Sequence, residues 1–482
     1  MNTDTEIRRS NWRWVICSLL FFATTINYLD RQVLSLTWKD FIAPEFHWTD
    51  SDYGTVTSFF TFFYAVVSLL AGKMIDRLGA RKGYLLAIFI WSLAACLHAG
   101  CGWATVHIVG LESNETLYRI QSGSALALAV ASVSVWLFMG CRALLAVGEA
   151  GNFPAAIKSV SLYFPKKDRA FATAIFNAGC SVGALGAPLC IPSLAKAMGW
   201  EAAFLIIGAL GFIWMGFWAK LYTAPENSNH VNAAELSYIT QDEKGESEAA
   251  IEADQHDTIP FLKCLGYRQT WAFVAGKALT DGVWWFFLFW APAYFSDQFG
   301  YASYTGMGQA LIFTLYLIVT VVSIFGGYLS KIFIDRLKMN PYAGRMRAML
   351  IFAFMELVAL FAQPLGLFSA WWPAIIIGLA AGAHQAWSAN LFSTVGDMFP
   401  SSTVATIVGL GTMSGGIGSA LVTKGSGMLF DYAASMGDAF SFCGFTGKPA
   451  GYMIVFAGCS VAYLIAWTVM KLLVPRYRPV RP

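Results

Sequence analysis

The chain has 482 residues, of which 57% are hydrophobic and 13% charged, whereas a typical soluble domain is about 25% charged. This composition excludes an ordinary soluble domain and indicates a protein that crosses a membrane many times. The net charge of +3 is too small to indicate a nucleic-acid partner. The nine cysteines have no paired spacing and no histidine partner, so we expect neither a disulfide framework nor a metal site.

Twelve apolar stretches are long enough to cross a bilayer. Six precede a polar segment and six follow it, so we predict an all-α membrane protein with twelve transmembrane helices in two pseudo-symmetric six-helix bundles. The predicted bundles cover 1–222 and 269–482, and the linker covers 223–268, of which 235–257 is acidic and expected to be solvated and partly flexible. The predicted spans lie near 12–36, 53–75, 83–103, 125–158, 168–195, 200–222, 269–296, 307–334, 347–368, 371–398, 403–430 and 449–474.

The distribution of basic residues predicts the orientation of these spans. With the N-terminus inside, 24 of the 32 lysines and arginines face the cytoplasm and five face outside, which is the bias that sets orientation in membrane proteins. We therefore expect both termini and the linker to be cytoplasmic. The other three, Arg31, Arg142 and Lys277, fall within predicted spans, where an ionisable residue is costly and usually functional.

The first span contains the sequence NYLDR at 27–31, which places Asp30 beside Arg31. Adjacent residues of a helix point about 100° apart, so these two charges serve different neighbours instead of neutralising each other. We expect Arg31 to face a central cavity and hold a substrate carboxylate. We expect Asp30 to reach a neighbouring helix and take part in protonation. A structural ion pair with Arg142 or another span is the alternative for either residue.

The second span closes with GKMIDRLGARKG at 72–83, and the eighth closes with GGYLSKIFIDRLKMNPYAGRMR at 326–347. Both place an Asp-Arg pair before further basic residues in a short turn. Asp76 and Asp335 are 259 residues apart, about half the chain. This echo indicates a duplicated six-helix unit, and hence a transporter whose site lies between its halves.

In the fourth span, Arg142 and Glu149 are seven residues apart, so they share a face and stand about 10 Å apart along the helix axis. The planar guanidinium of a buried arginine suits a carboxylate and stays charged at any cellular pH. A buried glutamate can change its protonation state when another anion arrives, as proton coupling requires. Asn152 lies three residues beyond Glu149, within reach of the same face, where it would bind substrate or orient Glu149.

Polar residues also mark the fifth and seventh spans. Asn177 in the fifth span is a candidate for a polar face towards substrate. Lys277 and Asp281 in the seventh span are i and i+4, which fits an ion pair as well as a sugar or carboxylate contact. Trp284 and Trp285 either stack on a sugar ring or anchor an interface.

The tenth span contains HQAWSAN, which carries polar groups through a stretch that could have been entirely apolar. Gln385, Ser388 and Asn390 supply the hydrogen-bond donors and acceptors that a hydroxyl-rich substrate requires. His384 belongs either to a proton path or to a hydrogen bond within the bundle.

Several of these stretches together resemble a known family. The pattern G-x-x-x-D-R-x-G-x-R-K at 72–82 resembles the loop signature of the major facilitator superfamily. Within it, the chain resembles the anion:cation symporter family, over essentially all twelve spans. The stretches that carry this resemblance are NYLDR, the Arg142 to Pro154 pattern R-x6-E-A-x3-P, FNAGCSVGALGAP (176–188), LTDGVWWFFLFWAPAYF (279–295) and HQAWSANLFSTVGDMFP (384–400). The last two resemble the hexuronate transporters in particular.

The resemblance implies roles for two further sets of residues. Tyr28 and Tyr64 match tyrosines that line the family's site and bond the substrate. A gating loop is implied as well, in which Asp76 caps a helix terminus and pairs with basic residues to hold the cytoplasmic side closed. The implied gating residues are Gly72, Asp76, Arg77 and Arg81.

We therefore predict a transporter and not an enzyme, since the sequence has no HExxH, no CxxC and no glycine-rich phosphate loop. The predicted function is proton-coupled import of a sugar acid, a hexuronate such as glucuronate or galacturonate, by alternating access. Arg31 and Arg142 would bind the carboxylate, while Asp30 and Glu149 would carry the proton. A sodium-coupled or exchange carrier for another organic anion or a phosphate ester is the alternative.

The expected setting follows from the same resemblance. We expect a multi-pass protein of the bacterial cytoplasmic (inner) membrane that functions as a monomer in the lipid bilayer. Its expected small-molecule partner is the sugar-acid anion. No nucleic acid and no cofactor other than the coupling ion H⁺ are expected.

Overall fold

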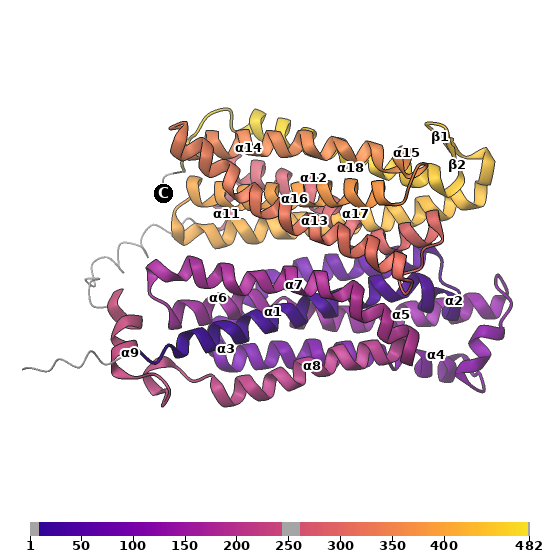
Figure 1. Cartoon of the computed structure of the whole chain (residues 1–482), viewed down its shortest axis with the longest axis horizontal. Coiled ribbons are helices and arrows are strands. Elements are labelled where there is room, and N and C mark those ends of the chain that lie inside the picture. Colours follow the sequence, from indigo (N-terminus) through magenta and orange to yellow (C-terminus); the bar gives the residue numbers. More distant parts are fainter. Residues whose placement is uncertain (1–8, 243–260, 481–482) are drawn as a thin grey trace, which may run out of the picture.

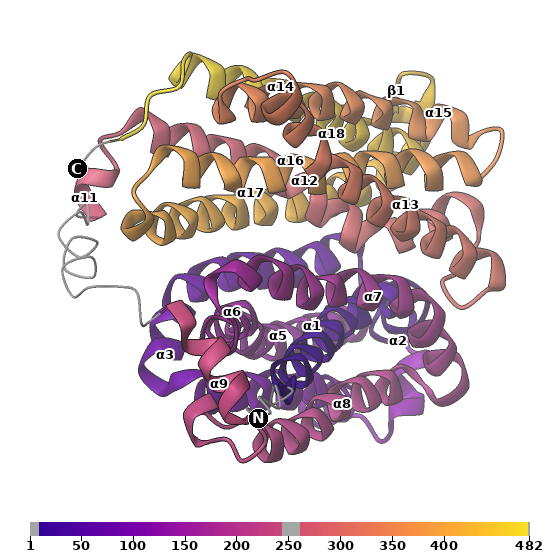
Figure 2. The same ribbon diagram turned by 60° about the vertical axis from the view of Figure 1, so that its left-hand side comes forward.

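The computed structural model describes residues 9–242 and 261–480. Within these ranges the chain is almost entirely helical, apart from a short antiparallel hairpin in which β1 (Ser441–Phe442) pairs with β2 (Phe445–Thr446). The helices run along the long axis of the molecule in two groups (Figure 1), and the view in Figure 2 separates them clearly. The predicted all-α fold with two six-helix halves is confirmed.

The first half consists of six membrane-spanning segments and short connecting elements. Its elements are α1 (Trp12–Thr37), η1 (Trp38–Ile42), α2 (Ala43–Phe46), α3 (Asp50–His98), α4 (Cys101–Val109), η2 (Asn114–Arg119), α5 (Ala125–Glu149), α6 (Asn152–Tyr163), α7 (Lys166–Met198) and α8 (Trp200–Leu221). Two spans share the continuous element α3, whereas α5 and α6 together make one span.

The connection and the second half follow the same plan. The connection contains η3 (Pro225–Asn227), α9 (Ala233–Ile239), η4 (Thr240–Asp242) and α11 (Phe261–Cys264). The second half contains α12 (Arg268–Phe299), α13 (Gly306–Lys331), η5 (Ile332–Arg336), α14 (Pro341–Glu356), η6 (Leu357–Phe361), α15 (Ala362–Gly366), α16 (Trp371–Met398), α17 (Ser401–Met436), η7 (Gly437–Ala439) and α18 (Gly447–Leu473). Here α14, η6 and α15 form a single span.

The chain reverses between its second and third spans at one residue. Gly79 has φ 75° and ψ 162°, outside the helical region, whereas the residues on both sides continue as helix. A side chain at this positive φ would be strained, so glycine is the residue that allows the kink. This turn lies where the sequence predicts it.

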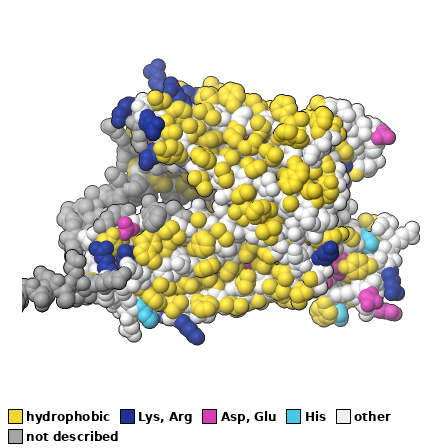
Figure 3. Space-filling model, in the orientation of Figure 1, with side chains coloured by type: hydrophobic (Ala, Val, Ile, Leu, Met, Phe, Trp, Pro, Cys, Tyr) yellow, Lys and Arg dark blue, Asp and Glu magenta, His cyan; other side chains and the backbone are white. Residues whose placement is uncertain are grey.

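The surface and the helix lengths show a multi-pass membrane protein. Among the described residues, ten helical segments are long and apolar enough to cross a membrane. Hydrophobic side chains cover the middle of the face in Figure 3, and lysines and arginines gather near its ends. The two remaining long helices, α1 and α16, are less apolar because they carry buried polar side chains, including Asp30, Arg31 and His384.

Two ends of the molecule are distinguished below. The linker end carries α9, α11 and the C-terminal residues, and the hairpin end carries α2, α4, β1 and β2 (Figure 1). The predicted boundaries of the two bundles and the linker stay a prediction, because no boundary is marked by an independent observation.

The first part of the connection packs firmly against the first half. Glu235 on α9 is fully buried and accepts hydrogen bonds from the backbone N–H groups of Trp12 and Arg13 at 2.9 and 3.2 Å. These groups begin α1 and have no partner within their own helix, so the carboxylate caps that helix. The Arg13 guanidinium adds an ion pair of 3.1 Å. The prediction of a solvated segment is therefore wrong at Glu235, and 243–257 lies outside the described residues.

At the hairpin end the two halves are joined by ion pairs. Lys39 on η1 contacts Asp50 of its own half at 3.3 Å and Asp297 of the second half at 2.8 Å. Lys448 on α18 contacts the same two carboxylates at 2.5 Å each. Asp431 on α17 accepts hydrogen bonds from the first two backbone N–H groups of α3, at 3.0 and 2.7 Å. The hairpin end is therefore closed by alternating charges from both halves.

Candidate functional site

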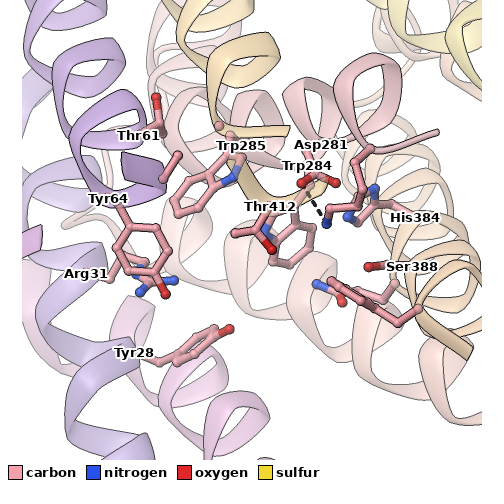
Figure 4. Close-up of a pocket in the computed structure, with 15 residues that line it drawn as sticks. Tyr28, Arg31, Thr61, Tyr64, Asp281, Trp284, Trp285, His384, Ser388 and Thr412 are labelled. Carbon is pink, nitrogen blue, oxygen red and sulfur yellow. Dashed lines mark ion pairs between the residues drawn. The ribbon is translucent and has the colours of Figure 1, made fainter. Parts of the chain in front are cut away.

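A cavity of about 230 Å³ lies between the two halves and is lined by the middle portions of five helices. Figure 4 shows Tyr28, Arg31 and Tyr64 on one side and Asp281, His384 and Ser388 on the other. The lining residues are Tyr28 and Arg31 of α1; Thr61, Tyr64 and Ala65 of α3; Lys277, Asp281, Trp284 and Trp285 of α12; His384, Gln385, Ser388 and Phe392 of α16; and Thr412 and Gly416 of α17.

Arg31 is the charged group on the first-half wall. Its Nε and Nη2 atoms donate to the same oxygen, Oε2 of Glu149, at 2.9 and 2.7 Å. The guanidinium also lies 5.1 to 5.4 Å from three ring centroids, those of Tyr28, Tyr64 and Trp285. These aromatic faces hold a cation in place without neutralising it. Nη1 has no hydrogen-bond partner among the described residues, so Arg31 keeps a donor for another anion.

Trp285 crosses between the halves at this point. It belongs to α12 of the second half, and its ring lies near those of Tyr64 and Phe60 in the first half, at centroid distances of 6.4 and 6.2 Å. Movement of one half relative to the other would therefore change what covers Arg31. The sequence leaves the role of this tryptophan open, and the structure places it on the cavity wall.

Behind Arg31 lies a buried group of charges within the first half. Glu149 and Arg142 on α5 and Asp30 on α1 are each 2% exposed or less. Several of their atoms are buried without a hydrogen-bond partner in the described part of the chain: both carboxylate oxygens of Asp30, Oε1 of Glu149, and Nε and Nη1 of Arg142. Because a buried charge without a partner is costly, such carboxylates are suited to taking up a proton.

The sequence leaves a structural ion pair as the alternative for both Asp30 and Arg31, and the structure shows such a pair for Arg31 only. Arg31 forms the ion pair with another span that the sequence leaves as its alternative, and its partner is Glu149. Asp30 lies near enough to Arg142 to interact with it electrostatically. No ion pair joins those two side chains among the interactions of the described residues. The two adjacent charges thus serve different neighbours, as the helical geometry predicts.

The second-half wall carries its own ion pair. Lys277 Nζ lies 2.7 Å from Asp281 Oδ2, and both residues line the cavity. Figure 4 labels Asp281 and draws this ion pair as a dashed line. His384 stacks on Trp284 with a centroid distance of 5.6 Å, and its Nδ1 atom lies 2.6 Å from the Tyr463 hydroxyl. The ion pair that the sequence offers for Lys277 is therefore present, and the sugar or carboxylate contact stays a prediction.

Several predicted site residues lie where they were expected, and others do not. Tyr28, Tyr64, Arg31, Gln385 and Ser388 line the cavity. The predicted residues that do not line it are Arg142, Asn152, Asn177 and Asn390, together with the predicted proton carriers Asp30 and Glu149.

Asn152 does not line the cavity and instead contacts the third span. α5 ends at Glu149 and α6 begins at Asn152, and the Asn152 Oδ1 atom accepts a hydrogen bond of 2.6 Å from the Tyr84 hydroxyl. Asn390 is buried and donates to the Ala386 carbonyl of its own helix. Asn177 is exposed and accepts a weak hydrogen bond from the Cys180 thiol at 3.5 Å.

Arg142 borders a second, narrower space away from the cavity. That space is lined by Leu34, Tyr53, Thr57, Phe60, Arg142 and Phe289. The Arg142 guanidinium lies 5.4 Å from the Phe60 ring centroid. Arg142 and Phe60 line this second space and do not line the cavity.

The predicted gating loop is held within the first half. Arg81 Nη2 donates to the Ala219 carbonyl at 2.6 Å, in the last turn of α8, where a positive charge favours the helix dipole. Arg77 is exposed, and a Cβ atom at Gly72 would meet nothing within 4 Å. The Asp76 side chain lies outside the described residues. The gating role of these residues stays a prediction.

The cavity also contains residues that sequence reasoning missed. Thr61 and Thr412 place hydroxyl groups on its wall, and Ala65, Gly416 and Phe392 complete the lining. For Thr61 and Thr412, the only indication in the sequence was a single threonine within an apolar span. It is weak because threonine in a helix commonly bonds the preceding turn, as Thr61 does with the Ser58 carbonyl at 3.0 Å.

Comparison with known proteins agrees with this architecture. Residues 20–423 match the family profile described as Major Facilitator Superfamily. The hexuronate transporter of Escherichia coli (strain K12) is 27% identical over 422 residues, which cover 87% of this chain and 88% of that protein. An E. coli (strain K12) protein named "Probable galactarate/D-glucarate transporter" is 28% identical over 342 residues, 69% of each chain.

Among solved structures, a bacterial homologue of the human lysosomal transporter Spinster, in an inward-facing and occupied conformation, has a TM-score of 0.68. It is 20% identical and the match covers 97% of this chain and 99% of that one, which establishes a shared fold. The family profile matches most of the chain, and the structure has a cavity between two six-helix halves. The chain is a transporter, not an enzyme, and belongs to the Major Facilitator Superfamily.

Proposed function

We propose that the chain is a proton-coupled symporter that imports a sugar acid, with a hexuronate such as glucuronate or galacturonate as its substrate. The observation that carries this proposal is the ion pair of Arg31 with Glu149 at the wall of a cavity shared by both halves. The relatives support the substrate class, because one of them is named a hexuronate transporter and another carries the name of two further sugar acids.

The proposed coupling uses competition for Arg31. While Glu149 is ionised, it occupies two N–H groups of the guanidinium. A proton on Glu149 removes its negative charge and releases these donors to a substrate carboxylate, for which the planar guanidinium is well suited. Loading the cavity with one anion and one proton then leaves its net charge unchanged. Asp30 is proposed as a second proton carrier, since both its oxygens are buried without hydrogen bonds in the described structure.

The remaining walls suit the rest of a sugar acid. Gln385, Ser388 and Thr412 face the cavity with amide and hydroxyl groups that can both donate and accept. Trp284 and Trp285 offer flat apolar surface beside these polar groups. This combination of a few placed polar groups with aromatic walls is typical of sites for small hydroxylated ligands.

For alternating access, we propose that the linker end faces the cytoplasm of a bacterial inner membrane and that the protein acts as a monomer. In that orientation both termini are cytoplasmic, and the charged contacts of Lys39, Asp50, Asp297 and Lys448 close the outer side. Opening the outer side requires these pairs to separate, while the gating loop at 72–83 would then close the cytoplasmic side.

A specific observation favours a second substrate class. Lys277 provides a positive charge on the wall opposite Arg31, so the cavity has a cation in each half. A hexuronate has one carboxylate, whereas galactarate and glucarate have one at each end. A sugar dicarboxylate could therefore engage both cations, as long as Asp281 releases Lys277 in the way that Glu149 releases Arg31.

Uptake into proteoliposomes tests the proposed function and distinguishes hexuronates from sugar dicarboxylates as substrates. Purified protein is reconstituted, and uptake of labelled glucuronate, galacturonate and glucarate is measured with the pH gradient and the sodium gradient imposed separately. We expect an acidic exterior to drive concentrative uptake of at least one hexuronate, and the sodium gradient to have no effect. Uptake driven by sodium alone, or exchange without accumulation under either gradient, would contradict the proposal and favour the alternative carriers.

A further inference from the structure

Glu356 is a buried carboxylate that the proposed coupling does not use. It ends α14 in the second half and is fully buried. Neither of its oxygens has a hydrogen-bond partner in the described part of the chain, which includes every long helix around it. An ionised carboxylate in such a place would cost several kcal/mol. The geometry therefore favours a carboxyl group that holds a proton.

The group that faces Glu356 from α18 is the phenol of Tyr463. The helices α14 and α18 pack against each other, and Tyr463, like Glu356, is fully buried between them and their neighbours. Trp387 packs edge-on against the Tyr463 ring with a centroid distance of 5.3 Å, which fixes the position of the ring. The hydroxyl is thus held between Glu356 and a third group on another helix.

That third group is His384 on the cavity wall. Its Nδ1 atom lies 2.6 Å from the Tyr463 hydroxyl, which also approaches the Thr280 carbonyl at 3.3 Å. His384 is 4% exposed and lines the cavity. Three titratable side chains from α14, α18 and α16 therefore lead from a buried carboxyl group to the substrate space, with a hydrogen bond between Tyr463 and His384 and a close approach without a well-formed hydrogen bond between Glu356 and Tyr463.

We infer that Glu356, Tyr463 and His384 form a second proton path, in which Glu356 stores a proton and His384 exchanges it with the cavity. The inference rests on the proposed proton coupling and adds a proton site in the second half. In the transfer, His384 Nδ1 takes the hydroxyl proton of Tyr463 while the phenol oxygen takes the carboxyl proton of Glu356. The imidazolium then releases its Nε2 proton to the cavity, so only O–H and N–H bonds change.

The charges around the path link it to the substrate. Lys277 and Asp281, which pair at 2.7 Å, line the same cavity as His384. A positive Lys277 disfavours an imidazolium at His384, whereas an anion in the cavity favours it. Arrival of a sugar acid would thus draw the proton from Glu356 towards the cavity, which couples occupancy to protonation.

Two isosteric variants test the path, with a third as control. Glu356→Gln removes the proton store, and Tyr463→Phe removes the connecting hydroxyl with little change of shape. Glu45→Gln is the matched control, because Glu45 is also a buried carboxylate but accepts hydrogen bonds from Trp200 and Tyr118 at the hairpin end.

The first measurement needs no transport. Infrared spectra of the reconstituted protein are recorded in H₂O and in D₂O, and the difference between them reports the C=O band of protonated carboxyl groups. We expect Glu356→Gln to remove one such band and Tyr463→Phe to shift it, while Glu45→Gln leaves it unchanged. A spectrum in which Glu356→Gln removes no protonated-carboxyl band would overturn the inference.

The second measurement counts protons. A pH dye inside proteoliposomes records the protons that enter with each sugar acid, together with the accumulation reached. We expect Glu356→Gln and Tyr463→Phe to lose one proton per cycle, which lowers the accumulation limit about tenfold for a gradient of about one pH unit. Wild-type proton counts in both variants would overturn the path alone. Absence of proton entry in the unmodified protein would instead overturn the proposed coupling and the path together.

Discussion

The Arg31 guanidinium donates both Nε and Nη2 to a single oxygen of Glu149, at 2.9 and 2.7 Å. The other oxygen of Glu149 is buried and has no hydrogen-bond partner among the described residues. Among the described residues, Arg31 is thus the only side chain that donates hydrogen bonds to this carboxylate, and Arg31 lines the cavity. A change at either residue should therefore alter substrate binding and proton binding together.

Replacing Glu149 with glutamine imitates the protonated state permanently. We expect Glu149→Gln to retain exchange of external labelled hexuronate for internal substrate, because Arg31 stays available to the carboxylate. We expect it to lose concentrative uptake under a pH gradient, because no proton can be released. Counterflow and gradient-driven uptake in the same proteoliposomes check this. Accumulation at the level of the unmodified protein would show that Glu149 is not the coupling site.

The positive charge of Lys277 should matter most for a substrate with two carboxylates. Lys277→Met keeps much of the side-chain length and removes the charge opposite Arg31. We expect it to raise the KM for glucarate by about 10 to 100-fold, equal to about 1.4 to 2.7 kcal/mol, and to change the KM for glucuronate by much less. The double variant with Asp281→Asn controls for the carboxylate left unpaired. Equal losses for both substrates would argue against a dicarboxylate contact.

Features that depend on a short stretch of the chain could be predicted from the sequence. The twelve spans were predictable because apolar length is a local property of the chain. Arg31 was predictable because a charge inside an apolar span needs a reason. Gln385 and Ser388 line the cavity as their three-residue spacing on α16 allows.

Other features depend on partners that are remote in the sequence. Asn152 accepts a hydrogen bond from Tyr84, which lies 68 residues earlier in the chain, and spacing along α5 and α6 does not reveal that partner. From the sequence alone, Glu235 belongs to an acidic segment that is expected to be solvated. In the folded chain it contacts the start of α1, which is more than 200 residues away in the sequence. Periodicity along one helix carries no information about such contacts.

The ion pairs at the hairpin end should set the balance between the two access states. Asp297→Asn would leave Lys39 and Lys448 with only Asp50 between them, so that like charges from opposite halves repel. We expect the hairpin end to open more often, seen as a longer distance between spin labels at Glu115 and Ser435, both exposed at that end. Raised salt should weaken the effect.

The control for this variant is Asp438→Asn, an exposed carboxylate near β1 whose hydrogen-bond partner is Thr446 in its own half. It changes the charge of the same end by the same amount without touching a contact between the halves. A shift of equal size in both variants would mean that overall charge, and not the pairing of Lys39 and Lys448 with Asp297, holds the end closed.

Close packing of α17 on α3 should hold the same end closed by shape alone. A Cβ atom at Gly427 would lie 2.3 Å from the Asp50 carbonyl oxygen, far inside contact distance, whereas a Cβ atom at Gly425 would meet nothing within 4 Å. We therefore expect Gly427→Ala to separate the halves at the hairpin end and to lengthen the same spin-label distance. The cause is steric, so high salt should not reverse the change, in contrast to Asp297→Asn. Gly425→Ala lies two residues away on the same helix and carries the same change in helix propensity, so it should leave the distance unchanged. An equal lengthening in both alanine variants would show that helix stiffness, and not the contact with Asp50, controls this closure.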